Sequence, residues 1–162
     1  MVSNKPWADF DPIPIQPLDR LKWEHVRLID GIGRLQLHAD GREADREGIH
    51  AEAAAVLKAL EYHQEAEERF LFPLVWGHGE ALLAGLRKEH LRFVMGSARL
   101  LSLTGPGRET ALAVYLATLR TKLETHFTKE ESGVFLEAVS SLSPAQMDIL
   151  RIKFASRKGM EL

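Results

Sequence analysis

Four segments of the chain carry apolar residues at the three- and four-residue spacing of an amphipathic helix, and polar side chains interrupt each apolar stripe. The segments run from about Asp19 to Ala39, Asp45 to Phe72, Glu80 to Leu103 and Arg108 to Val139. The interrupting residues are His25, His63 with Glu67, His90, and His126 with Glu130. An unpaired buried carboxylate costs on the order of several kcal/mol. These side chains must therefore meet one another, or a common partner, where the helices pack.

One ten-residue pattern occurs twice in the chain. His63 to Phe72 reads HQEAEERFLF and His126 to Phe135 reads HFTKEESGVF, so both fit His-x-x-x-Glu-Glu-x-x-x-Phe. Histidine and glutamate four residues apart lie about 6 Å from each other on one helix face. His25 precedes His63 by 38 residues and His90 precedes His126 by 36. We therefore expect an internally doubled chain in which each half supplies part of one metal cage of four imidazoles and two carboxylates.

Weaker interpretations apply to each residue taken alone. A lone core histidine is usually satisfied by a hydrogen bond, and a single His-x-x-x-Glu is common on solvated helix faces. The joint pattern favours a metal, although a neutralised His–Glu network without metal stays an alternative. The neighbouring glutamates are expected to be solvated, with orientation of an imidazole N–H as the other possibility; they are Glu24, Glu68, Glu89 and Glu131. After Glu67 the apolar spacing places Phe70 and Leu74 on the buried face. Tyr115 is expected in the core or at the border of a ligand channel.

The chain length and the positions of helix-ending glycine and proline residues predict a single all-α domain over residues 1–162. Residues 1–18 hold four prolines and are expected to form an extended arm. An up-down-up-down four-helix bundle is expected over about 19–140. Asp19 is the expected N-cap of its first helix. Ser143-Pro144 then opens a short fifth helix over about 143–157.

Composition narrows the chemistry and the partners. The chain has no cysteine, so a metal would be held by nitrogen and oxygen donors alone. The net charge is −2 and no basic run stands out, which argues against nucleic acid and anionic membranes as partners. No apolar run approaches the roughly 18 residues of a membrane span. We therefore expect a cytoplasmic protein.

These residues resemble the hemerythrin-like, HHE cation-binding family over about residues 19 to 140. The resemblance rests on His25, His63 to Pro73, Glu89-His90, and His126 to Glu131. It implies a four-helix bundle with a non-haem di-iron site, in which the four histidines are terminal ligands and Glu67 and Glu130 bridge. Oxygen carriers of the family place two histidines four residues apart on the third helix, where this chain has Leu86 as the earlier residue. Their last motif also has a longer spacing, to aspartate. The sequence thus argues against reversible oxygen carriage.

The expected function is a metal-binding protein that holds two non-haem iron ions, with manganese or zinc possible, and binds or senses oxygen, nitric oxide or iron itself. The expected ligands are His25, His63, Glu67, His90, His126 and Glu130. No catalytic residue or protein partner is identified, and the physiological partner is expected to be a small diatomic molecule or peroxide. The alternative is a di-iron enzyme that acts on peroxide or nitric oxide or repairs iron clusters.

Overall fold

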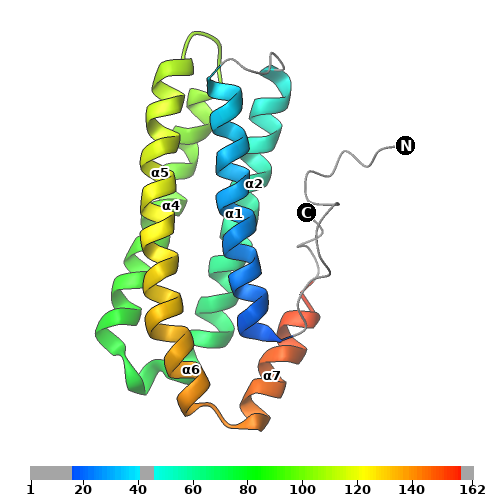
Figure 1. Ribbon diagram of the computed structural model, residues 1–162, viewed down its shortest axis with the longest axis vertical. Coiled ribbons are helices and arrows are strands. Elements are labelled where there is room, and N and C mark those ends of the chain that lie inside the picture. Colours follow the sequence, from blue (N-terminus) through cyan, green and yellow to red (C-terminus); the bar gives the residue numbers. More distant parts are fainter. Residues whose placement is uncertain (1–15, 41–45, 158–162) are drawn as a thin grey trace.

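The computed structural model describes residues 16–40 and 46–157, and within those residues it contains helices and no strand (Figure 1). The α-helices are α1 (Pro17–Ala39), α2 (Arg46–Ala66), α3 (Phe72–Val75), α4 (Glu80–Leu103), α5 (Glu109–Lys129), α6 (Phe135–Ser141) and α7 (Pro144–Ala155). Two π-helical turns, η1 (Glu67–Leu71) and η3 (Glu130–Val134), and one 3-10 turn, η2 (Trp76–His78), complete the described elements. The prediction of an all-α helical bundle is confirmed.

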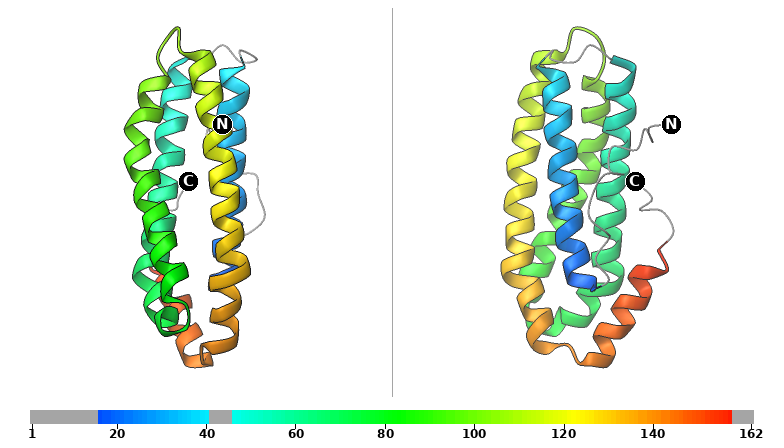
Figure 2. Two further views of the ribbon diagram at one scale, coloured as in Figure 1. Left: turned by 90° about the vertical axis from the view of Figure 1, so that its left-hand side faces the viewer. Right: turned by 45° about the vertical axis from the view of Figure 1, so that its right-hand side comes forward.

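The long helical rods pack side by side around a common interior. In Figure 1, α1 runs upward, the rod from α2 to α3 runs downward, α4 runs upward, and the rod from α5 to α6 runs downward. Helix α1 contacts α2 and α5, and α4 also contacts α2 and α5, so the rods close into a ring (Figure 2). Helix α7 packs at the lower end against α1 and η1.

The interior consists of two apolar clusters with a polar layer between them. The upper cluster includes Leu28 and Leu123, whereas the lower one includes Leu21 and Val134. His25 lies between Leu21 and Leu28 along α1, and His126 follows Leu123 along α5. Because every rod passes from one cluster to the other through this layer, the fold brings the interrupted positions of all four rods to one level.

Each π-helical turn begins at the glutamate of a His-x-x-x-Glu motif. The N–H of Phe72 donates to the carbonyl of Glu67, and the N–H of Phe135 donates to the carbonyl of Glu130, five residues back in both cases. Turns of this type insert one extra residue into a helix and are frequent at functional sites. Leu136 occupies the position that Pro73 has in the first copy. The second π turn therefore forms without a proline.

The π turn corrects two features of the predicted second helix. Leu71 and Val75 are buried, whereas Phe70 and Leu74 are half-buried, because the extra residue rotates the apolar face. Pro73 was expected to end or kink the second helix after Phe72. The rod does not end there but continues to Val75, with Pro73 in the first turn of α3.

The helix ends agree with the sequence in part. Helix α1 begins at Pro17 after Gln16, not after Asp19, which lies in the first turn. Residues 17 and 18 thus belong to the bundle and not to the predicted arm, whose residues 1–15 lie outside the described part of the chain, as does the expected start at Asp45. Ser143 caps α7 as predicted, with a reciprocal pair of hydrogen bonds to Gln146. Across residues 16–40 and 46–157, no helix has both the length and the apolarity to cross a bilayer.

Because the π turn buries Leu71 more than Leu74, leucine-to-alanine substitutions at the two positions should lower the free energy of unfolding by different amounts. Leu71→Ala should lower the free energy of unfolding by about 2–4 kcal/mol, because Leu71 is fully buried. Leu74→Ala should cost about 1 kcal/mol, because the π turn leaves Leu74 half-buried. Urea denaturation of the metal-free variants measures both values. An equal or larger loss for Leu74→Ala would show that the rod has no π turn in solution.

Candidate metal centre

Six polar side chains converge in the layer between the two apolar clusters. They are His25, His63, Glu67, His90, His126 and Glu130, and all six are buried. They form two overlapping groups, one with His25 and His63 and the other with His90 and His126, and both groups include Glu67 and Glu130. Within each group the candidate ligand atoms lie within 4.8 Å of one another. The structure therefore brings together every residue that the sequence pattern singled out.

Four further glutamates hold the outer nitrogens of the imidazole rings. The Nδ1 atom of His25 lies 2.7 Å from Glu131, and that of His90 lies 2.7 Å from Glu68. The Nδ1 atom of His63 lies 2.8 Å from Glu24, and that of His126 lies 2.7 Å from Glu89. An ionised carboxylate only accepts hydrogen bonds, so Nδ1 carries the proton in each pair. Whenever the ring is neutral, Nε2 presents a lone pair; a second proton on Nε2 turns it into a donor.

All four Nε2 atoms point toward the centre of the layer. The Nε2 atoms of His25 and His63 are 3.1 Å apart, and those of His90 and His126 are 3.0 Å apart. The Nε2 atom of His126 lies 2.9 Å from a Glu130 oxygen, and that of His63 lies 3.4 Å from a Glu67 oxygen. Lone pairs that face one another and a carboxylate at these distances repel unless a proton or a metal cation lies between them.

The two central carboxylates give the clearest indication of a cation. Among the residues that the structure describes, both oxygens of Glu67 and both oxygens of Glu130 are buried without a geometrically acceptable hydrogen bond. Buried carboxylates are normally paired or bound to a metal. Imidazole nitrogens and carboxylate oxygens suit iron, manganese and zinc. The residues present therefore fit a metal site with two positions that share Glu67 and Glu130.

Each copy of the repeated decapeptide supplies two candidate metal ligands, one histidine and one glutamate. It also supports one histidine of the other pair. In the first copy, His63 and Glu67 face the centre, while Glu68 binds His90 and the ring of Phe72 stacks on His90 with centroids 5.8 Å apart. The second copy repeats this arrangement on His25. There Glu131 binds Nδ1 and the ring of Phe135 stacks at 5.6 Å. Each copy thus fixes the histidine that comes from a different rod.

The second possibility considered for the four outer glutamates, orientation of an imidazole N–H, is what the structure shows. The expectation that they are solvated was wrong for Glu24, which is completely buried, whereas the other three are partly exposed while their carboxylates remain bound to imidazole. A signal was present in the sequence, because Glu24 and Glu89 directly precede His25 and His90, and Glu68 and Glu131 directly follow the motif glutamates. The role of these glutamates can be assigned only from the arrangement of the rods, because every one of these hydrogen bonds joins two different rods.

Burial and mutual contact shift the pKa values of the central groups in opposite directions. Burial and the neighbouring charge of Glu130 raise the pKa of Glu67 to about 7. Burial raises the pKa of Glu130, but the imidazoles of His126, His25 and His90 outweigh it and hold that pKa well below its usual range. Burial lowers the pKa of His25, but Glu130 and Glu67 outweigh it and raise the value to about 10. Without metal, the centre therefore retains protons at neutral pH.

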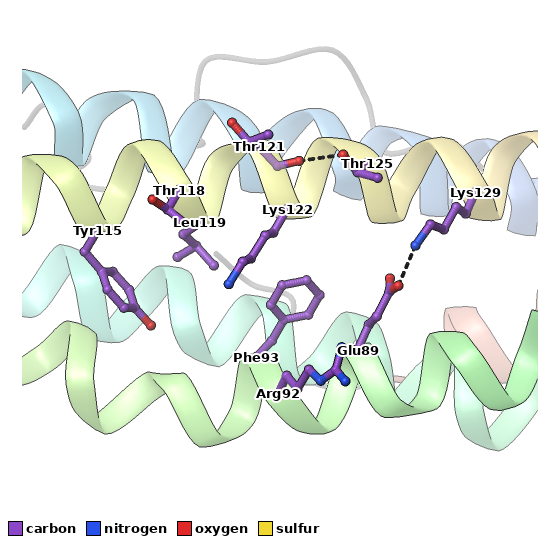
Figure 3. Close-up of a pocket in the computed structure, with 10 residues that line it drawn as sticks. All are labelled: Glu89, Arg92, Phe93, Tyr115, Thr118, Leu119, Thr121, Lys122, Thr125 and Lys129. Carbon is purple, nitrogen blue, oxygen red and sulfur yellow. Dashed lines mark hydrogen bonds and ion pairs between the residues drawn. The ribbon is translucent and has the colours of Figure 1, made fainter.

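Basic side chains fix the two glutamates that hold the motif histidines. Glu24 accepts from Arg157 at 2.7 Å and from Arg20 at 3.3 Å. Glu89 accepts from Lys129, as Figure 3 shows. Burial acts to raise the pKa of both carboxyl groups, but the imidazoles and basic side chains outweigh it and lower both. Both glutamates therefore remain ionised acceptors.

A groove of about 300 Å³ between α4 and α5 runs beside this layer (Figure 3). Its lining includes Glu89, Phe93 and Tyr115. The hydroxyl of Tyr115 donates to the carbonyl of Gly96 at 3.0 Å. Phe93 is buried and meets the ring of His126 edge-on at 5.3 Å. An aromatic ring contacts His126 beside this groove, and Tyr115 both lines the groove and packs, partly buried, against the upper apolar cluster.

The fold and the site define a class: a helical bundle with histidine and glutamate donors gathered in a buried polar layer. The profile of the Hemerythrin HHE cation binding domain matches residues 16–138. This match covers most of the chain, and the chain therefore belongs to the hemerythrin HHE cation-binding family. Comparisons with curated proteins and with solved structures gave no match. The resemblance based on the repeated motif is confirmed.

The pKa shifts predict how pH changes the stabilisation by metal. In the metal-free protein, the raised pKa values of Glu67 and His25 stabilise the fold fully below about pH 4.5. That contribution is lost as pH rises through about 7 and then about 10. A metal replaces the protons, so its stabilisation should grow between about pH 5.5 and about pH 8. Thermal melts of metal-free and zinc-loaded protein at both pH values measure the difference. A melting-temperature gain that is independent of pH would contradict this linkage.

A second prediction concerns the C-terminal helix. Arg157→Met should lower stability by about 1–3 kcal/mol and speed the loss of metal to a chelator, because Glu24 is buried and loses its shortest basic contact. Arg151→Met is the matched control, since Arg151 lies on α7 in an exposed pair with Asp148. Equal behaviour of the two variants would mean that Arg157, which follows α7, does not support the centre.

Proposed function

We propose that this protein binds two non-haem iron ions in the centre of an up-down-up-down four-helix bundle. His25 and His63 would hold one ion, His90 and His126 the other, and Glu67 and Glu130 would bridge both. The observation that carries the proposal is the set of four buried carboxylate oxygens without hydrogen bonds, surrounded by four inward Nε2 atoms. The alternating direction of the rods in Figure 1 supports the topology.

Iron is the proposed metal because the family binds cations and bundles of this kind hold di-iron or di-manganese carboxylate centres. Affinity alone would not select iron over zinc, since stability constants rise from manganese to copper. Iron supplies one-electron redox chemistry and open coordination positions when it is bound. Manganese and zinc are the alternatives that elemental analysis would detect.

The proposed role is binding or sensing of a small molecule such as oxygen or nitric oxide, or of iron itself. Each metal position has two imidazoles and two shared carboxylates. An octahedral ion would then keep positions open for an external ligand. The same open positions support the second candidate, an enzyme that acts on peroxide or nitric oxide or in iron-cluster repair. Catalytic turnover of added peroxide would favour that candidate, whereas stable uptake of one ligand favours binding.

The test is iron content after anaerobic loading and desalting. Wild type should retain close to two iron ions per chain, in keeping with the two groups of donors, and the oxidised protein should change its visible spectrum with azide. His63→Ala and His126→Ala should lower both the iron content and the melting temperature. His78→Ala is the control, because His78 is exposed and pairs with Glu137 away from the centre. Wild type without iron would refute the proposed function. Full iron without any azide response would refute the open positions.

A further inference from the structure

The two metal positions have the same donors, so a difference between them must come from their surroundings. Each group has two histidines and the same two glutamates. One turn before His25 stands Leu21, and one turn before His90 stands Leu86. Both leucines are buried in the lower apolar cluster. The position of Leu86 therefore does not distinguish one half of the centre from the other.

The half with His25 and His63 is covered by an aromatic ring. Phe127, the residue after His126, stacks on His25 with centroids 3.9 Å apart and planes 9° from parallel. The same ring meets His63 edge-on at 5.7 Å. Phe135 stacks on His25 as well. Phe127 is buried, so its ring fills the space against one face of His25 and beside His63, and it also meets the neighbouring ring of His126 edge-on at 5.8 Å.

In the repeated motif, Gln64 corresponds to Phe127, because Gln64 follows His63 as Phe127 follows His126. Gln64 is therefore the residue whose position beside the His90–His126 half corresponds to that of Phe127 beside the His25–His63 half. Gln64 is 4% exposed, and its side-chain nitrogen has no hydrogen-bond partner among the described residues. A buried amide without a partner is costly, and its presence calls for a ligand or water that accepts from it.

Gln64 and His90 both line a groove of about 330 Å³ between α2 and α4. One of the six central residues, His90, therefore lines this groove directly. In the α4–α5 groove, Phe93 is a lining residue and contacts His126, which does not line that groove. Its charged lining residues are Glu61, Glu65, Glu68, Arg69 and Arg87. Acidic groups outnumber basic ones, which favours an uncharged ligand over an anion.

We propose that a small uncharged ligand reaches the metal of the His90–His126 half through the α2–α4 groove and accepts a hydrogen bond from the Gln64 amide. Phe127 closes the His25–His63 half to the same ligand. The ligand is a diatomic molecule or hydrogen peroxide, whose outer atom accepts the N–H. This inference rests on the proposed di-iron function and adds to it which metal position is used and which residue holds the ligand.

Exchange of the two residues tests the proposal, with nitric oxide as the probe. The probe is added to anaerobic, iron-loaded protein and followed by stopped-flow visible absorption. Gln64→Phe should slow association and weaken binding by at least about tenfold, since it covers His90 as Phe127 covers His25. Phe127→Gln should open the second half and raise the number of nitric oxide molecules bound per chain. Iron content should stay at the wild-type value in both variants.

Gln64→Leu separates the hydrogen bond from the access route. Leucine fills a similar volume without a donor, so association should be unchanged and dissociation faster by about fivefold, as expected for one hydrogen bond. If Gln64→Phe and Gln64→Leu both bind nitric oxide like wild type at full iron content, this inference is wrong and the di-iron function stands. Wild type without iron would overturn the di-iron function and this inference with it.

Discussion

Hydrogen bonds between imidazole Nδ1 atoms and glutamate carboxylates govern the interior of this bundle. Each of the four histidines makes one such bond, at 2.7 to 2.8 Å, to a glutamate from a different rod. The bond fixes the orientation of the ring and places a proton on Nδ1, so all four Nε2 atoms face two buried carboxylates. Without these outer acceptors, the rings could rotate or carry the proton on the inner nitrogen. The polar layer would then lose its affinity for a cation.

The same bonds explain why the polar layer stays compatible with a packed core. Each rod crosses from the upper apolar cluster to the lower one through this layer, and the bonds between rods fix the level of the crossing. The π turns begin at Glu67 and Glu130, the two carboxylates shared by both halves. By inserting one residue, each turn aims a glutamate at the centre and still returns the following leucine or valine to the lower cluster.

The chain is doubled in its donors but not in what surrounds them. Glu68 with Phe72 and Glu131 with Phe135 repeat the same support in the two halves, whereas Gln64 and Phe127 differ. The outer supports differ as well. Lys129 from α5 holds Glu89, while Arg157 holds Glu24 from a segment beyond the family match at residues 16–138. Local asymmetry of this kind gives the two donor groups, which have equal composition, different surroundings.

The sequence by itself determined the helical class and the six central residues, because a histidine or glutamate on an apolar stripe is conspicuous at helical periodicity. It also determined the cap at Ser143, which depends only on neighbouring residues. The tertiary structure decided what periodicity cannot express. The bonds of Glu24, Glu68, Glu89 and Glu131 join different rods, and a residue that appears solvated on its own helix becomes the acceptor for a ring on another. The burial of Leu71 in place of Phe70 depends on a π turn, and its i to i−5 hydrogen bond has no signature in the spacing of apolar residues. The sequence could not show that the side-chain nitrogen of Gln64 lacks a hydrogen-bond partner among the described residues. Whether a side chain between two rods is hydrogen-bonded depends on the residues of both rods.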